Sequence, residues 1–144
     1  HLMICVDLSE VGGDECQIFL DKVAQNPTGH IASTVFPAKA SPLIIGHSLG
    51  SGYFKGAVDE FAIWVGEDLR TQSKVDEIYG TGEPTDLANL STISAPTTWF
   101  RMGDKATIVS GLAEDNITIP DQIGTYDLTS EAMVAADVQT DVPS

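Results

Sequence analysis

The segment FKGAVDEFAIWVG, residues 54–66, is the longest strand-like run in the chain. Alternate positions are largely apolar on both sides: Val58, Ala62 and Trp64 would lie on one face of a strand, and Ala57, Phe61 and Ile63 on the other. A strand that is apolar on both faces belongs in the middle of a layered β structure. The segment therefore predicts a central strand of a mainly-β domain.

Shorter strand candidates lie on both sides of this segment, and glycine and proline residues separate several of them. They cover residues 2–7, 16–23, 32–36, 42–46, 97–102, 106–110, 117–119 and 125–129. Many short strands divided by turns are typical of an antiparallel sandwich or jelly roll, and alternating β/α units would need more helices.

Residues 71–80 carry the only helix signals that stand out in the chain. Thr71 is a good N-cap, Val75, Ile78 and Tyr79 share one helical face, and Gly80 stands where a left-handed C-terminal residue belongs. The pattern predicts one short helix of about eight or nine residues.

Charge and length limit the classes of function. The 144 residues are enough for one domain with a core. Seven Lys and Arg residues against 21 Asp and Glu residues give a net charge of −14, which repels nucleic-acid phosphates and anionic lipid. No apolar run approaches the roughly 18 residues of a membrane-spanning helix. We expect neither nucleic-acid binding nor membrane insertion.

The segment Gly46-His47-Ser48-Leu49-Gly50 matches the G-x-S-x-G nucleophile elbow of lipases and esterases. That elbow needs a helix directly after the serine and a histidine further along the chain. Residues 49–64 read as a glycine-rich turn and a strand, and the histidines (His1, His30 and His47) all precede Ser48. We interpret residues 46–52 as a polar turn and expect the protein not to be an enzyme.

Other candidate chemistry is weak. Asp59 and Glu60 are adjacent on the expected strand, so their carboxylates would point to opposite faces and could not act as a glycosidase pair. No Cys or His spacing matches a metal site. Residues 101–105, 113–116 and 120–122 offer oxygen donors for Ca²⁺, but none has the spacing of a calcium loop, and solvated turns are the favoured interpretation. We predict no cofactor, with calcium kept as an alternative.

Apolar surroundings favour interior positions for Trp64 and Trp99. Cys5 and Cys16 lie in two neighbouring strand candidates, where one hairpin register would bring them together and another would not. Two buried free thiols are the favoured state, and a disulfide stays an alternative.

Residues 42–84 resemble the C-terminal half of a laminin-G-like, concanavalin A-like jelly roll. The matching positions are Ile45, Gly46, Phe54, Gly56, Val58, Asp59, Glu60, Phe61, Ile63, Trp64, Leu69, Thr71, Ile78, Tyr79 and Gly82. Residues 1–7 and 16–24 resemble two earlier strands of that family. The resemblance implies an all-β antiparallel jelly-roll sandwich with one short α-helix, of which this chain is the C-terminal part.

Residues 84–104 and 117–133 resemble an extension found in laminin-G-like virion proteins of marine and cyanobacterial phages. The matching positions are Trp99, Arg101, Met102, Gly103, Asp104, Asp121, Gln122 and Gly124, and a closing element matches at Asp137, Val138, Asp141 and Pro143. The family's Asn-Gly after the turn is replaced by Thr125-Tyr126. The resemblance divides the chain into the half jelly roll, residues 1–90, and a C-terminal β extension and tail, residues 91–144.

This resemblance implies a non-catalytic structural protein on the virion surface, as capsid decoration or as a tail or fibre component. Its partners would be other virion subunits in an oligomeric assembly and a host-cell glycan. The alternative is a secreted or cell-surface carbohydrate-binding module that depends on calcium. A hydrolase using Ser48 or a carboxylate pair is the third hypothesis.

Overall fold

The structure is a computed structural model that describes residues 1–7, 16–25, 44–48, 52–82, 85–102, 107–109 and 116–130. Its elements in chain order are β1 (Leu2–Val6), β2 (Cys16–Leu20), β3 (Val23–Gln25), β4 (His47–Ser48), β5 (Gly52–Tyr53), β6 (Phe61–Ile63), α1 (Gln72–Tyr79), the 3₁₀ helix η1 (Leu87–Asn89), β7 (Thr98–Phe100), β8 (Thr107–Val109), β9 (Asn116–Ile119) and β10 (Leu128–Thr129). The strand expected at 32–36 lies outside the described residues.

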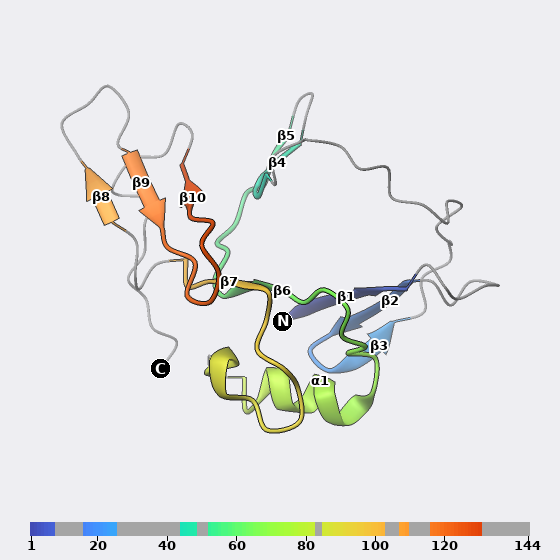
Figure 1. The fold of residues 1–144 in the computed structure, drawn as a ribbon. Coiled ribbons are helices and arrows are strands. Elements are labelled where there is room, and N and C mark those ends of the chain that lie inside the picture. Colours follow the sequence, from blue (N-terminus) through green and yellow to red (C-terminus); the bar gives the residue numbers. More distant parts are fainter. Residues whose placement is uncertain are drawn as a thin grey trace.

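The prediction of a mainly-β, antiparallel chain is confirmed. Two sheets have three strands each, in the orders β1-β2-β3 and β10-β9-β8, and two further pairs join β4 to β5 and β6 to β7. Every pairing between these strands is antiparallel. Figure 1 shows β1, β2 and β3 on one side of the β6-β7 pair and β8, β9 and β10 on the other, with α1 below. No helix in the described part of the chain has the length and apolar character needed to cross a membrane.

The hydrophobic core lies where α1 meets the strands above it. It joins residues from β1, β2, α1, η1 and β7, with Leu69 and Ile93 from connecting segments: Met3, Phe19, Leu69, Val75, Ile78, Leu87, Ile93 and Trp99. Cys5, Ala62, Trp64 and Leu90 pack against this cluster. One face of β1 and one face of β6 therefore share a single core, which fixes these two strands near each other.

The predicted helix is confirmed as α1. Thr71 is its N-cap residue with extended backbone angles, and Gly80 ends it with φ of 57°. Val75 and Ile78 are buried, as the spacing requires. The amide of Gly80 donates to the carbonyl of Asp76 at 2.9 Å, so a local signal and its backbone geometry agree at this end.

The long strand expected over residues 54–66 is wrong in extent. Only Phe61–Ile63 forms a strand, β6, and the two residues Gly52–Tyr53 form β5 before it. Glu60 interrupts the extended backbone because its φ is 50°, in the left-handed region that strands do not use. Its amide donates to the carboxylate of Asp59 instead.

The strand expected over residues 16–23 is divided by a tight turn. Asp21 and Lys22 have φ of 47° and 69°, and positive φ at both positions is the requirement of a two-residue type I′ hairpin. Phe19 pairs with Met3 on one side and with Ala24 on the other. The single expected strand is thus β2 and β3.

The strand expected over residues 42–46 is also wrong in position. Residues 42–43 lie outside the described part, residues 44–46 are not in a strand, and Gly46 has φ of 84°. β4 follows directly and pairs His47 with Tyr53 and Ser48 with Gly52. Downstream, the strands expected at 97–102, 106–110 and 117–119 are confirmed in their central residues as β7, β8 and β9. Of the strand expected at 125–129, only the last two residues, Leu128–Thr129, form β10.

Candidate functional site

A cleft with a volume of about 1060 Å³ opens between β1 and the segment that contains β6. Residues 1–7 line one wall without a break, and residues 57–64 line the opposite wall without a break. The α1 residues Ile78 and Tyr79 and the η1 residue Leu87 also line it. Because α1 packs under both walls, its position sets the width of the cleft.

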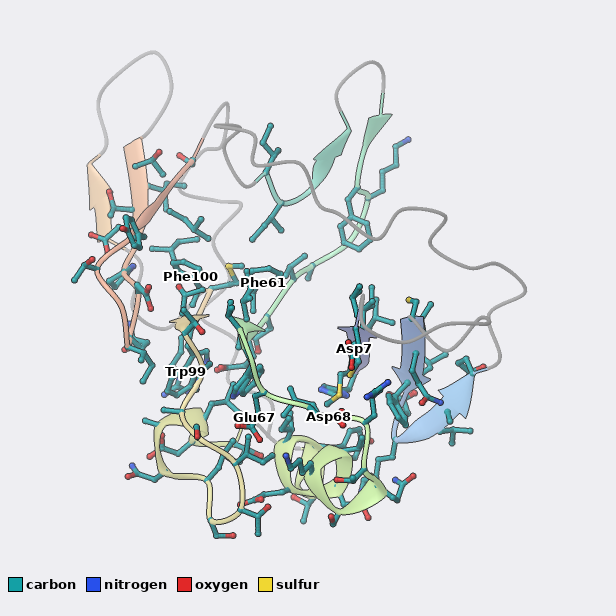
Figure 2. All side chains as sticks on the ribbon, turned by 45° about the vertical axis from the view of Figure 1, so that its right-hand side comes forward. Asp7, Phe61, Glu67, Asp68, Trp99 and Phe100 are labelled. Carbon is teal, nitrogen blue, oxygen red and sulfur yellow. The ribbon has the colours of Figure 1, made fainter. Side chains whose placement is uncertain are left out.

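Carboxylates concentrate along this cleft. Among the described residues, Arg70 is the one Lys or Arg residue that lines it, against five acidic residues: Asp7, Asp59, Glu60, Glu67 and Asp68. Figure 2 shows Asp7 and Asp68 near one another above α1, with Trp99 and Phe100 on the other side of β6. The cleft therefore has a negative potential that favours cationic ligands.

Arg70 joins the end of β1 to the segment before α1. One terminal guanidinium nitrogen (Nη2) lies 3.1 Å from Oδ2 of Asp7, and Nε lies 2.9 Å from Oδ1 of Asp68. The side-chain and backbone hydrogen bonds from Arg70 lower the pKa of Asp68 to about 2. Next to them, Nζ of Lys74 lies 2.6 Å from Oε1 of Glu67 and donates to the carbonyl of Asp68.

Glu60 lies on the opposite wall, directly before β6, and contacts β7 and the residue that follows it. Its carboxylate accepts hydrogen bonds from the indole nitrogen of Trp99 and, at 3.1 Å, from Nε of Arg101. Burial raises the pKa of Glu60, and the hydrogen bond from Trp99 and the charge of Arg101 act against that rise. Glu60 makes these contacts from a left-handed backbone, with φ of 50°.

These contacts limit the chemistry of the cleft. Each of its five carboxylates already accepts a hydrogen bond from within the chain. Cys5 lines the cleft, but burial raises the pKa of its thiol, which disfavours the reactive thiolate. Among the described residues, no group of three or more His, Cys, Asp and Glu side chains is placed to hold a metal ion.

A second feature is the outer face of the β1-β2-β3 sheet, which carries apolar side chains in the open. Leu2 pairs with Leu20, and Leu20 also pairs with Val23, so these three share one face with Ile4 and Val6. Their exposed fractions lie between 44% and 62%. Met3 and Phe19, on the opposite face, are buried in the core. Contiguous apolar surface of this kind marks an interaction site.

The residues singled out in the sequence are placed as follows. Ser48 and His47 form the short strand β4, and the residues after Ser48 that an elbow needs as a helix are outside the described part until β5 begins. Asp59 and Glu60 do not lie in a strand, so the opposite-face argument against a carboxylate pair was wrong in its geometry. The two carboxylates instead differ in their contacts, since that of Glu60 accepts hydrogen bonds from Trp99 in β7 and from Arg101 directly after β7.

The carboxylate of Asp121, one of the candidate calcium donors, forms hydrogen bonds within the fold. It accepts hydrogen bonds from Oγ1 of Thr98 and from the amides of Trp99 and Ile123. Burial opposes ionisation, but these hydrogen bonds and one from the Gly124 amide lower the pKa of Asp121 to about 2. Residues 120–122 directly follow β9 and contact β7, through an isolated bridge between Asp121 and Phe100 and a hydrogen bond of 2.8 Å from the amide of Gln122 to the carbonyl of Trp99. Most of residues 101–105 and 113–116 lie outside the described residues.

The expectation of interior tryptophans is confirmed, because Trp99 is buried and Trp64 packs against the core. Both cysteines are free thiols, as favoured. Cys5 pairs with Gln17 and Cys16 pairs with Val6, so the two thiols point to opposite faces of the sheet.

The sequence interpretation missed the apolar outer face of β1-β2-β3. The signal was present, because residues 2–6 are apolar at every position and such strands are covered on both faces in sandwiches. It also missed Glu77, whose carboxylate accepts hydrogen bonds from the amides and hydroxyls of Ser91 and Thr92. Nothing local in the sequence indicates that contact.

Comparisons with protein-family models, with curated proteins and with solved structures found no match for this chain.

Proposed function

We propose that this chain is a non-catalytic structural module of a larger assembly, and that the outer face of β1-β2-β3 packs against a neighbouring subunit. The observation that carries the proposal is the row of exposed side chains on that face: Leu2, Ile4, Val6, Leu20 and Val23. The second face of an antiparallel sheet is polar when it meets water, and here it is aliphatic.

The free energy available from burying this face favours an assembly with many contacts over a tight isolated dimer. Covering a half-exposed aliphatic side chain contributes about 1 kcal/mol, so this face supplies roughly 5 kcal/mol. Association costs at least about 4 kcal/mol in lost translational and rotational freedom. The face therefore gives weak pairing alone and strong binding only where several contacts act together, as in a particle.

The finer assignment is a jelly-roll component of a phage virion surface. It rests on the resemblance of residues 42–84, 84–104 and 117–133 described above and is supported by the mainly-β antiparallel architecture with one α-helix. The negative charge of −14 fits a protein exposed on a particle and kept from binding nucleic acid. Mass spectrometry of purified phage particles is expected to detect peptides of this chain.

Sedimentation velocity over a concentration series tests the subunit contact. Because most soluble oligomers contain identical subunits, another copy of the chain is the first partner to measure. The full chain is expected to associate weakly and reversibly, and the double variant Ile4→Thr, Leu20→Thr to stay monomeric. Val65→Thr is the matched control, because Val65 is 76% exposed and lies away from the sheet. Equal association in all three proteins, or none in the parent chain, would contradict the proposal.

A further inference from the structure

β1 has one edge that is not used by the β1-β2-β3 sheet. The amide of Asp21 donates to the carbonyl of His1 at 3.0 Å, which sets the ladder so that the peptide groups of Met3 and Cys5 bond to β2. The peptide groups of Leu2, Ile4 and Val6 then point to the other edge. Within the described residues, no strand pairs with that edge.

β6 faces this edge across the cleft. β6 pairs with β7 along one edge, and in the described part of the chain it has no other partner. Both figures show β1 and β6 beside each other above α1. The cleft between them is lined by unbroken runs of residues, 1–7 and 57–64, so it follows two strand-like segments along their length.

The lining also specifies the side chains that would fit. Met3, Ile63 and Leu69 supply apolar surface inside the cleft, while Asp59, Glu67 and Asp68 are among its acidic residues. An extended segment places alternate side chains on opposite faces. One face of an occupant would meet the apolar surface, and lysine or arginine side chains would reach the carboxylates.

We propose that the cleft between β1 and β6 binds one extended peptide segment of a partner protein, with apolar residues at alternate positions and basic residues at its ends. The segment adds a strand to the edge of β1, so its main-chain groups bond to Leu2, Ile4 and Val6. The proposal extends the binding role proposed above but uses the peptide groups at the edge of β1, whereas the subunit contact uses side chains on the outer face of the same strand, so either can fail alone.

The test uses the full chain and a synthetic, fluorescently labelled peptide of eight residues, in which valine and threonine alternate between terminal lysines. A matched peptide carries N-methyl groups on alternate amides, which removes main-chain donors on one edge and keeps the side chains. Because the N-methylated peptide loses two or three backbone hydrogen bonds, its dissociation constant is expected to be roughly tenfold or more higher than that of the unmodified peptide. Fluorescence anisotropy measures both constants. Amide exchange followed by NMR is expected to slow at Leu2, Ile4 and Val6 when the unmodified peptide binds.

Asp59→Asn is the matched protein variant, because its amide oxygen can still accept from the amide of Glu60. It is expected to weaken binding of the lysine peptide severalfold at low salt and to leave a peptide with terminal serines unaffected. The proposal would be overturned if the unmodified and N-methylated peptides bound equally, if the unmodified peptide did not bind, or if it protected amides other than those of Leu2, Ile4 and Val6. The sedimentation experiment above is independent of each of these outcomes.

Discussion

The carboxylate of Glu60 receives the indole N–H of Trp99, a buried residue that is 39 positions away in the chain. The same carboxylate forms an ion pair with Arg101, and its side chain is 18% exposed. Glu60 thereby supplies the acceptor for a buried donor in β7, and β6 begins at the next residue, Phe61. This contact joins the wall of the cleft to the core.

Replacing Glu60 with alanine is expected to lower the free energy of unfolding by about 2 kcal/mol, because the buried indole N–H of Trp99 loses its acceptor. Urea unfolding followed by tryptophan fluorescence measures the change. Glu60→Gln is the control, since its amide oxygen can accept from Trp99 while the ion pair with Arg101 is lost. Equal losses in the two variants would show that the indole contact contributes little.

Gly124→Ala is expected to lower the free energy of unfolding by about 1–3 kcal/mol. A Cβ at Gly124 would lie 3.2 Å from the carbonyl oxygen of Thr97 and closer still to the carboxylate of Asp121. The carboxylate would have to leave its hydrogen bonds to Thr98 and Trp99. Thermal unfolding measures the loss. The neighbouring variant Ile123→Ala, at a side chain that is 38% exposed, is expected to change stability much less. Similar losses at both positions would remove the steric explanation.

Local signals predicted the helix well. Thr71, Val75, Ile78 and Gly80 lie within ten consecutive residues, so the pattern that predicts α1 is short-range. The side chain of Thr71 makes no capping hydrogen bond, and only its position before the helix is as expected. The central residues of the strands expected at 2–7, 97–102, 106–110 and 117–119 were predicted for the same reason, since alternation over a few residues is a short-range property.

Strand limits depended on contacts that no local pattern reports. The apolar pattern of residues 54–66 continues through Glu60, but the contacts of Glu60 with Trp99 and Arg101 select a left-handed backbone there. Asp21 and Lys22 form a hairpin turn without the glycine that marks most type I′ turns. In that turn Nζ of Lys22 donates to the carbonyl of Gly80 and lies 4.6 Å from the ring centre of Tyr79.

The cleft was beyond sequence reasoning because its walls are far apart in the chain. Residues 1–7 and 57–64 meet only because Met3, Ala62 and α1 share one core. The exposed face of β1 was within reach, since apolar residues at each position from Leu2 to Val6 already indicate a strand covered on both sides.

Acid is expected to destabilise the protein through Asp121 and Glu77. Hydrogen bonds from Thr92 and Ser91 lower the pKa of Glu77 to about 2, and the pKa of Asp121 is also about 2. The unfolded chain has ordinary values, so it binds more protons than the folded protein as the pH falls below about 4.5. The stabilisation is complete above that pH and is lost as the pH approaches about 2. Glu60 acts in the opposite direction, because burial raises its pKa.

Urea midpoints measured at a series of pH values between about 5 and about 2 test this expectation. Asp121→Asn is expected to be less stable than the parent near neutral pH and to lose less stability on acidification. A parallel pH dependence in the variant and the parent would assign the acid sensitivity to other groups.

The register of β1 on β2 predicts which cysteine pair can form a disulfide. Cys5 and Cys16 point to opposite faces of the sheet, whereas Val6 lies directly opposite Cys16 in a non-hydrogen-bonded pair. Such pairs have Cα atoms about 4.5 Å apart, within the range of disulfides. Mild oxidation of Val6→Cys is expected to give a bond between positions 6 and 16, identified by peptide mass spectrometry, and the parent chain is expected to keep both thiols. A ladder shifted by one residue would join Cys5 to Cys16 in the parent, so that product would contradict both the register and the exposed face built on it.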